Sequence, residues 1–231
     1  MKLHAFITSA STLLAGMISV HAAALNIVNP GFESDLATAQ GNGGWSDAVP
    51  TGWSDPQGAD NTNFLETIGG FASEGQVHLG FDGNEFGMVY QDLGVAWAPN
   101  TTYTLTVGVG RRGGFGAGLG RFGLGSSLDV LPASGPSPDG PYSLHTPSVF
   151  FSDFDTATVA VTDGTFSDAV FSFTTGAIAP AGNVRVSVQE ISATRIHVDN
   201  FRLDATAAVP EPSSVALLGV LSGLALRRRR A

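Results

Sequence analysis

Residue types that carry acid–base or metal chemistry are thinly spread along this chain. Its central part contains three histidines, His78, His145 and His197, and none of them accompanies a serine in a nucleophile-elbow pattern. His78 and His197 fall on the polar positions of predicted strands. This parity favours contact with solvent over metal ligation, so the histidines alone predict no catalytic or metal centre.

Carboxylates are more numerous than histidines. Their number alone leaves open a pair of catalytic carboxylates of the glycosidase type, for example Glu66 with either Glu74 or Asp82. The predicted fold, a single sandwich without inserted catalytic loops, argues against that class of enzyme.

Aromatic residues in or near predicted loops form a second group with binding potential. They are Trp45, Tyr90, Trp97 and Tyr142. Aromatic ring faces stack on the apolar faces of pyranose sugars, so these residues are candidates for a sugar-binding platform. Loop aromatics serve equally often as lids over the core, and that alternative stays open. Trp53 follows a Pro-Thr-Gly turn and is predicted to be a core residue.

Arg111 and Arg112 are the only adjacent cations in the central part of the chain. They either bind an anionic or hydroxylated ligand or pair with neighbouring carboxylates. They lie within Gly108–Gly113, which has the spacing of a dinucleotide-binding fingerprint, but no helix is predicted to follow it. The glycines continue to Gly125, which predicts a mobile loop that closes over a ligand. The alternative is an ordinary hairpin whose apolar residues pack on the sandwich.

Strand patterns surround these residues. Apolar residues alternate with Thr and Gly from Tyr103 to Val109, and with polar residues from Val184 to Val188. Shorter runs predict strands at 25–28, 76–79, 86–93, 157–161 and 169–173. Many short strands separated by turn residues indicate an antiparallel sandwich or barrel.

The last predicted strand contains a change of parity. Ile196 and Val198 share one face, whereas Phe201 and Leu203 have the opposite parity. One extra residue at Asp199-Asn200 restores the inward direction, which predicts a β-bulge there.

Composition limits the possible partners. Residues 25–208 contain 19 acidic and six basic residues, with no lysine and no cysteine. Such a negative charge argues against nucleic acid and favours divalent cations. Without cysteine, any metal that staples the domain must be bound by oxygen.

The N-terminus reads as a secretory signal, residues 1–24. Lys2 precedes an apolar run, and Ala22-Ala23-Ala24 supplies a small-residue cleavage site, so Leu25 is the predicted mature N-terminus.

The C-terminus, residues 209–231, has three parts in a fixed order. Pro210-Glu211-Pro212 is followed by a short apolar helix and then by Arg227, Arg228, Arg229 and Arg230. This order resembles the PEP-CTERM sorting signal. The resemblance implies an exosortase-type protease as partner, a membrane-anchored intermediate with a cytoplasmic C-terminus, and delivery to the cell surface or extracellular matrix.

The central part also resembles a known group. Asn29-Pro30-Gly31-Phe32-Glu33, Pro50-Thr51-Gly52-Trp53, Pro99–Leu105 and Val198–Leu203 occur in the order seen in galactose-binding-like jelly rolls, the fold of many carbohydrate-binding modules. That resemblance implies a structural Ca²⁺ site at Glu33 and Asp199. The alternative is that both side chains only fix local turns by hydrogen bonds. Calcium-dependent cyclases look like the same module, and there Asp199 would be the general acid.

These observations predict an all-β protein, a single jelly-roll β-sandwich over residues 25–208, with an N-terminal signal helix and a C-terminal hydrophobic helix. The predicted function is non-catalytic binding of an envelope glycan at the surface. The alternatives are a purely structural matrix protein and a calcium-dependent cyclase-like enzyme.

Overall fold

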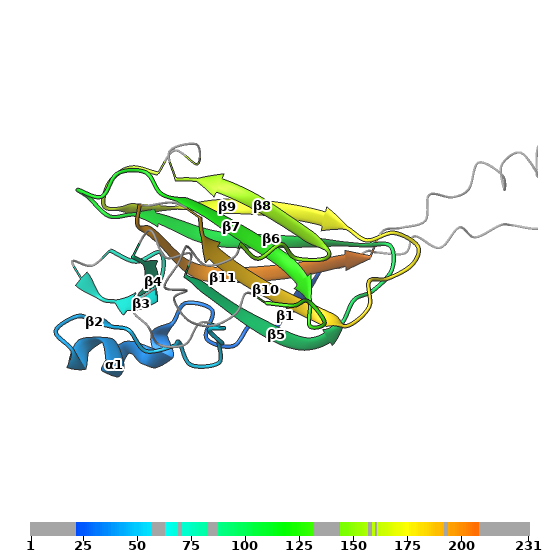
Figure 1. Ribbon diagram of the computed structural model, residues 1–231, viewed down its shortest axis with the longest axis horizontal. Coiled ribbons are helices and arrows are strands. Elements are labelled where there is room, and N and C mark those ends of the chain that lie inside the picture. The colour runs from blue at the N-terminus through cyan, green and yellow to red at the C-terminus, as the bar shows by residue number, and fades with distance from the viewer. Residues whose placement is uncertain are drawn as a thin grey trace, which may run out of the picture. The chain divides into compact units, whose positions relative to one another are not determined.

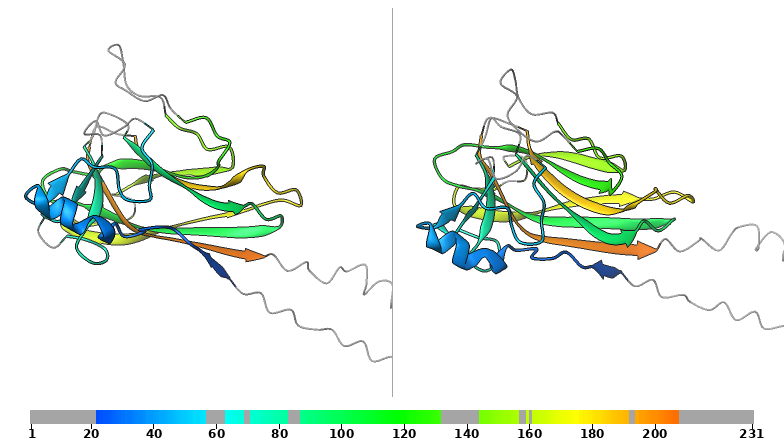
Figure 2. Two further views of the ribbon diagram at one scale, coloured as in Figure 1. Left: turned by 90° about the horizontal axis from the view of Figure 1, so that it is seen from below. Right: turned by 60° about the horizontal axis from the view of Figure 1, so that its bottom comes forward.

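The computed structural model describes residues 22–56, 63–68, 71–82, 87–131, 144–156, 159, 161–191 and 194–207. In this part of the chain two antiparallel sheets pack face to face, as Figures 1 and 2 show, and the predicted jelly-roll β-sandwich is confirmed. The elements are β1 (Ala23–Leu25), a 3₁₀ turn (Glu33–Asp35), α1 (Leu36–Gly41), β2 (Trp45–Ser46), β3 (Asn63–Glu66), β4 (His78–Phe81), β5 (Met88–Ala96), β6 (Thr101–Arg111), β7 (Leu119–Ser126), β8 (Phe150–Asp155), β9 (Thr165–Thr174), β10 (Asn183–Glu190) and β11 (Ile196–Ala207).

The core lies between a larger sheet and a smaller one. The larger sheet has the order β2-β3-β4-β11-β6-β9, with β1 also paired to β11, and the smaller sheet has the order β5-β10-β7-β8. Leu105 and Val107 of β6 are fully buried, as are Val186 and Val188 of β10. Strict alternation along these two strands places one apolar row from each sheet at the interface, where burial of apolar area stabilises the fold.

A β-bulge divides β11, as the parity of its residues predicts. The register with β6 shifts between Asp199 and Arg202, and Asn200 has a φ of 48°. Val198 and Phe201 are therefore both buried although three positions separate them. The bulge also divides the partners of β11, because residues 196–198 pair with β4 and residues 203–205 pair with β1.

Three predictions about strands differ from the structure. Of the run predicted at 25–28, only Leu25 belongs to a strand, β1. Val159 and Val161, the described residues of the run at 157–161, lie outside any strand, and the strand in this region is β8. The glycine-rich run does not stay a loop as far as Gly125, because β7 begins at Leu119 and pairs with both β8 and β10. Neighbouring side chains explain these glycines. A Cβ on Gly120 would lie 2.1 Å from the Phe154 ring.

Residues 1–21 of the predicted signal segment (1–24) and the whole predicted sorting segment (209–231) lie outside the described residues. Ala23 and Ala24, beside the predicted cleavage site, pair with Ala205 and Asp204 in β1. Among the residues that the structure describes, no helix has the length and apolar character needed to cross a membrane.

Gly120→Ala should destabilise the domain by about 1–3 kcal/mol, since the added methyl group overpacks the stacked Phe122 and Phe154 rings. Gly113→Ala is the matched control, because its Cβ would have no neighbour closer than 3.8 Å. Denaturant unfolding measures both variants, and equal stability of the two would contradict this account of β7.

Candidate functional site

A pocket of about 390 Å³ opens beside β3. It is lined by Trp45, Asp47, Asn63, Phe64, Glu66, Ile68, Asp82, Arg112 and Arg195. One wall of the pocket comes from β2 and β3 and includes Trp45, which is 48% exposed. The two arginines lie next to strand ends, Arg112 directly after β6 and Arg195 directly before β11. The lining therefore combines an aromatic surface with charges of both signs.

Ion pairs hold the charged groups of this pocket. Arg112 binds Glu66, and Arg195 binds Asp82. Both guanidinium groups also lie over the Phe115 ring, at 5.3 Å for Arg112 and 4.5 Å for Arg195. Such pairing fixes the donors and acceptors that face a bound molecule.

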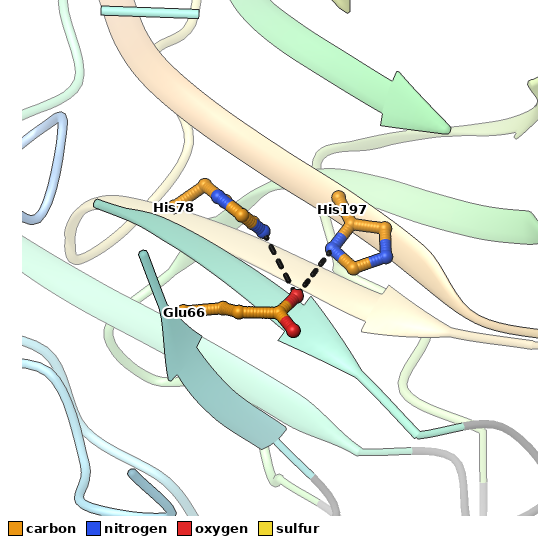
Figure 3. Close-up of side chains that lie close together, drawn as sticks. All are labelled: Glu66, His78 and His197. Carbon is orange, nitrogen blue, oxygen red and sulfur yellow. Dashed lines mark hydrogen bonds and ion pairs between the residues drawn. The ribbon is translucent and has the colours of Figure 1, made fainter. Parts of the chain in front are cut away.

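Behind the pocket, Glu66, His78 and His197 converge, and Figure 3 shows the three side chains pointing toward one another. His78 Nε2 lies 3.2 Å from Glu66 Oε2, and His197 Nδ1 lies 3.9 Å from the same oxygen. Glu66 and His78 are register partners across β3 and β4, and β4 pairs in turn with β11. Adjacent strands thus bring together three residues that are far apart in sequence.

The prediction that His78 and His197 face solvent is wrong, because both side chains are fully buried. Phe71 and Phe166 cover this face of the sheet, and the Phe71 ring lies 5.1 Å from His78 and 5.4 Å from His197. His197 fits because both of its register partners are glycines, Gly80 on β4 and Gly110 on β6.

Three of the four ring nitrogens of His78 and His197 lack hydrogen-bond partners among the described residues. Neither ring nitrogen of His197 has one, and neither does His78 Nδ1. Burial lowers the pKa of His197 well below its usual value, and the nearby His78, Arg112 and Arg195 add to this effect. His197 is therefore neutral at ordinary pH.

The second predicted site lies at the bulge. Asp199 is fully buried, and its Oδ2 accepts hydrogen bonds from the backbone N–H groups of Ser73 at 2.7 Å and Glu74 at 3.0 Å. Glu33 Oε1 accepts bonds from Gln76 and Val77, each at 2.7 Å. The same segment, exposed residues 73–76 and buried Val77, thus donates backbone hydrogen bonds to both carboxylates.

The pKa of Asp199 is raised to about 7, chiefly by burial and to a smaller extent by the charge of Glu33, while hydrogen bonds from three backbone N–H groups oppose the shift. Neither carboxylate belongs to the pocket lining. Two neighbouring acidic groups with oxygen atoms only are a donor set that suits Ca²⁺.

Arg111 and Arg112 each form an ion pair with a carboxylate, the second of the two alternatives predicted for them. Arg111 Nε lies 2.7 Å from Asp163 Oδ1, while Arg112 pairs with Glu66. Of the two, only Arg112 lines the pocket.

The four predicted platform aromatics do not gather in one place. Trp45 lines the pocket, but Trp97 is buried against Tyr103 with ring centroids 4.6 Å apart. Tyr90 lies in the other sheet beneath Arg185, and Tyr142 lies outside the described residues. Trp53 is a core residue, as predicted, and packs on Phe32 and Phe201.

The carboxylates considered for a glycosidase pair are placed differently. Glu66 and Asp82 line the same pocket, each bound to its own arginine, whereas Glu74 lies in the segment above Asp199. The sequence suggested Glu66 only as half of a glycosidase pair, and it gave no prediction for the pocket residues Asp47, Phe64 and Arg195. The Glu66–His78 spacing becomes informative only once β3 and β4 are known to pair.

In chelator, Asp199→Asn should become more stable relative to the unaltered protein as pH rises from about 4 to about 7. An unfolded Asp releases its proton near pH 3.9, whereas buried Asp199 keeps it until about 7, so over this window the native state holds one more proton and loses stability as pH rises. The full effect is about 4 kcal/mol.

Urea unfolding at several pH values measures the difference, in which contributions from the histidines cancel. Asp168→Asn, at an exposed ion pair with Arg202, is the control and should show no such trend. If the difference in free energy of unfolding between Asp199→Asn and the unaltered protein stays constant with pH, the raised pKa of Asp199 is refuted.

Comparison with known proteins adds two family matches. The family model described as HpiC1 cyclase, of the HpiC1-like family, matches residues 23–204, and the PEP-CTERM protein-sorting motif matches residues 208–230. No curated protein sequence matches the chain.

Two solved cyclases share the fold. A cyclase from Fischerella sp. TAU superposes with a TM-score of 0.59 at 19% identity, covering 82% of this chain and 100% of that one. A cyclase from the same source in complex with 4-(1H-indol-3-yl)butan-2-one gives 0.57 at 19% identity, covering 81% and 100%. The CBM22-1-CBM22-2 tandem domain of Paenibacillus barcinonensis Xyn10C gives 0.49 at 13% identity, covering 86% of this chain and 50% of that one.

Proposed function

From the premise that this chain belongs to the HpiC1-like cyclase family and carries a PEP-CTERM sorting motif, we propose that it is an exported surface protein whose pocket binds one unit of an envelope glycan. The observation that carries the proposal is the pocket wall, where the exposed Trp45 ring stands beside ion-paired carboxylates and guanidinium groups.

The pocket chemistry supports a compact hydroxylated ligand. Sugars present an apolar face to an aromatic ring, and their hydroxyl groups bond to charged donors and acceptors. Trp45 supplies the ring, while Asp47 and Arg195 supply polar partners within the same lining. A volume of about 390 Å³ lies at the small end of ligand pockets, which favours a single sugar unit over a long chain.

A cyclase-like enzyme is the second candidate, favoured by the family. Its relative from Fischerella sp. TAU was solved with an indole ketone, and Trp45, Phe64 and Ile68 could pack on a planar ligand of that kind. The general acid of such an enzyme would then be Glu66, which lines the pocket, because Asp199 is buried and does not line it.

Sorting belongs to the same proposal. An exosortase-type protease would cleave near Pro210-Glu211-Pro212 after the short helix has entered the membrane, with Arg227–Arg230 on the cytoplasmic side. The domain would then remain at the surface or in the matrix, where glycans are accessible to the pocket.

We also propose that Glu33 and Asp199 bind a structural Ca²⁺. Support comes from their shared segment at residues 73–77, and from the burial that raises the pKa of Asp199, to which repulsion by Glu33 adds. Calcium would offset that repulsion and hold the segment against β11.

Trp45→Ala should weaken binding of a pocket ligand by at least about tenfold, because ring stacking is lost, whereas Trp45→Phe should keep most of the affinity. Binding to immobilised glycans and to a panel of indoles, each measured directly, distinguishes the two candidate functions.

Phe151→Ala is the matched control, since Phe151 is 43% exposed and lies in β8, which contributes no residue to the pocket lining. If Trp45→Ala binds glycan as well as the unaltered protein does, the pocket is not the glycan-binding site. Indole binding with turnover would favour the enzyme.

Calcium at 100 times its dissociation constant should stabilise the protein by about 2.7 kcal/mol and raise its Tm by about 5–10 °C. Melting curves in millimolar calcium and in chelator measure the shift, which Asp199→Asn should abolish. Coincident curves for the unaltered protein would exclude the calcium site.

A further inference from the structure

The structure assigns a second cation site, distinct from the calcium site: we propose that Glu66, His78 and His197 bind a late first-row divalent metal ion of the Zn²⁺ class at the inner end of the pocket. The inference is compatible with a glycan as the pocket ligand, whereas a metal-bound Glu66 would not be the free acid that the cyclase candidate needs. It rests on the geometry and burial of these three residues and on the ring nitrogens of the two histidines that have no hydrogen-bond partner among the described residues.

The distances suit one ion. Zinc–ligand bonds of about 2.0–2.1 Å at tetrahedral angles separate neighbouring ligand atoms by about 3.3–3.4 Å. Glu66 Oε2 lies 3.2 Å from His78 Nε2 and 3.9 Å from His197 Nδ1, and all three ligand atoms lie within 4.8 Å of one another. An ion among them needs only sub-ångström adjustments of the side chains.

Hydrogen bonding alone does not explain the cluster. The Glu66–His78 contact is a possible hydrogen bond, but 3.9 Å to His197 is too long for one. Among the described residues, neither buried ring nitrogen of His197 then has a partner, although buried polar groups in folded proteins are almost always paired. A metal ion on Nδ1 supplies the missing partner.

The surroundings hold the ligands in place. Phe71 packs edge-on against both imidazoles, and Phe64 packs in the same manner against His197. Arg112 binds the other oxygen of Glu66, Oε1, and so orients the carboxylate while leaving Oε2 toward the histidines. Partners of this kind fix metal ligands in known sites.

The donor set selects the metal. Two imidazole nitrogens with one carboxylate suit zinc, cobalt, nickel or iron, whereas calcium and magnesium prefer oxygen ligands alone. Three protein ligands leave a coordination position open, and Glu66 lines the pocket. The open position would bind water or an oxygen atom of a pocket ligand.

The test uses purified protein without a histidine tag. Dialysis against Zn²⁺ in millimolar Ca²⁺, followed by elemental analysis, should give one zinc per chain, because calcium occupies only the oxygen site. Co²⁺ should produce the visible absorption of a tetrahedral site with nitrogen ligands. The imidazole NMR signals of His78 and His197 should shift on adding one equivalent of Zn²⁺, while those of His145 should not.

Variants supply the second arm. Glu66→Gln, His78→Gln and His197→Gln should each weaken zinc binding by more than about 100-fold, since loss of a direct ligand exceeds the effect of losing a supporting partner. His145→Gln is the matched control, because His145 is also buried with both ring nitrogens unpartnered among the described residues.

Two results would overturn the proposal. One is zinc binding that survives both His78→Gln and His197→Gln in folded protein. The other is unshifted His78 and His197 signals in the unaltered protein at one equivalent of zinc, a result that needs no variant to fold.

Discussion

The bulge in β11 is the constraint on which the rest of the structure depends. An extra residue at Asn200 lets Val198 and Phe201 both enter the core, while Asp199 and His197 point to the opposite face of the sheet. The same irregularity divides the neighbours of β11, with β4 before it and β1 after it. β11 therefore has core residues on one face and, on the other, one residue of each candidate cation site, His197 and Asp199.

Covering that second face is what makes the sites buried. Residues 71–77 lie over it, with Phe71 against the two histidines and the N–H groups of Ser73 and Glu74 on Asp199. Gly108 on β6 allows the close approach, since a Cβ there would lie 2.7 Å from Ser73 Oγ. Both sites therefore share one covering segment, to which Phe166 and Phe64 add at the histidines.

The alternation in β6 and β10 could be predicted because each strand has one face in the core, and the bulge could be predicted because parity must change around it. Periodicity does not say whether the opposite face is covered. Phe71 and Phe166 cover it from distant parts of the chain, so the burial of His78 and His197 was missed. The glycines of β7 misled for a similar reason, since Phe154 takes the space that a Cβ on Gly120 would need.

Charge explains why cation sites suit this domain. Its six arginines are matched one to one by carboxylates, in the pairs Arg111–Asp163, Arg112–Glu66, Arg121–Asp153, Arg185–Asp92, Arg195–Asp82 and Arg202–Asp168. Residues 25–208 contain 19 acidic side chains and no lysine, so this pairing leaves a large negative excess. Such a field concentrates divalent cations near the surface and keeps anionic polymers away. A cation at Glu33 and Asp199, and another at Glu66 and the two histidines, would place positive charge beside two buried carboxylates, those of Asp199 and Glu66. The stability of the fold would then depend on the divalent cations in its surroundings.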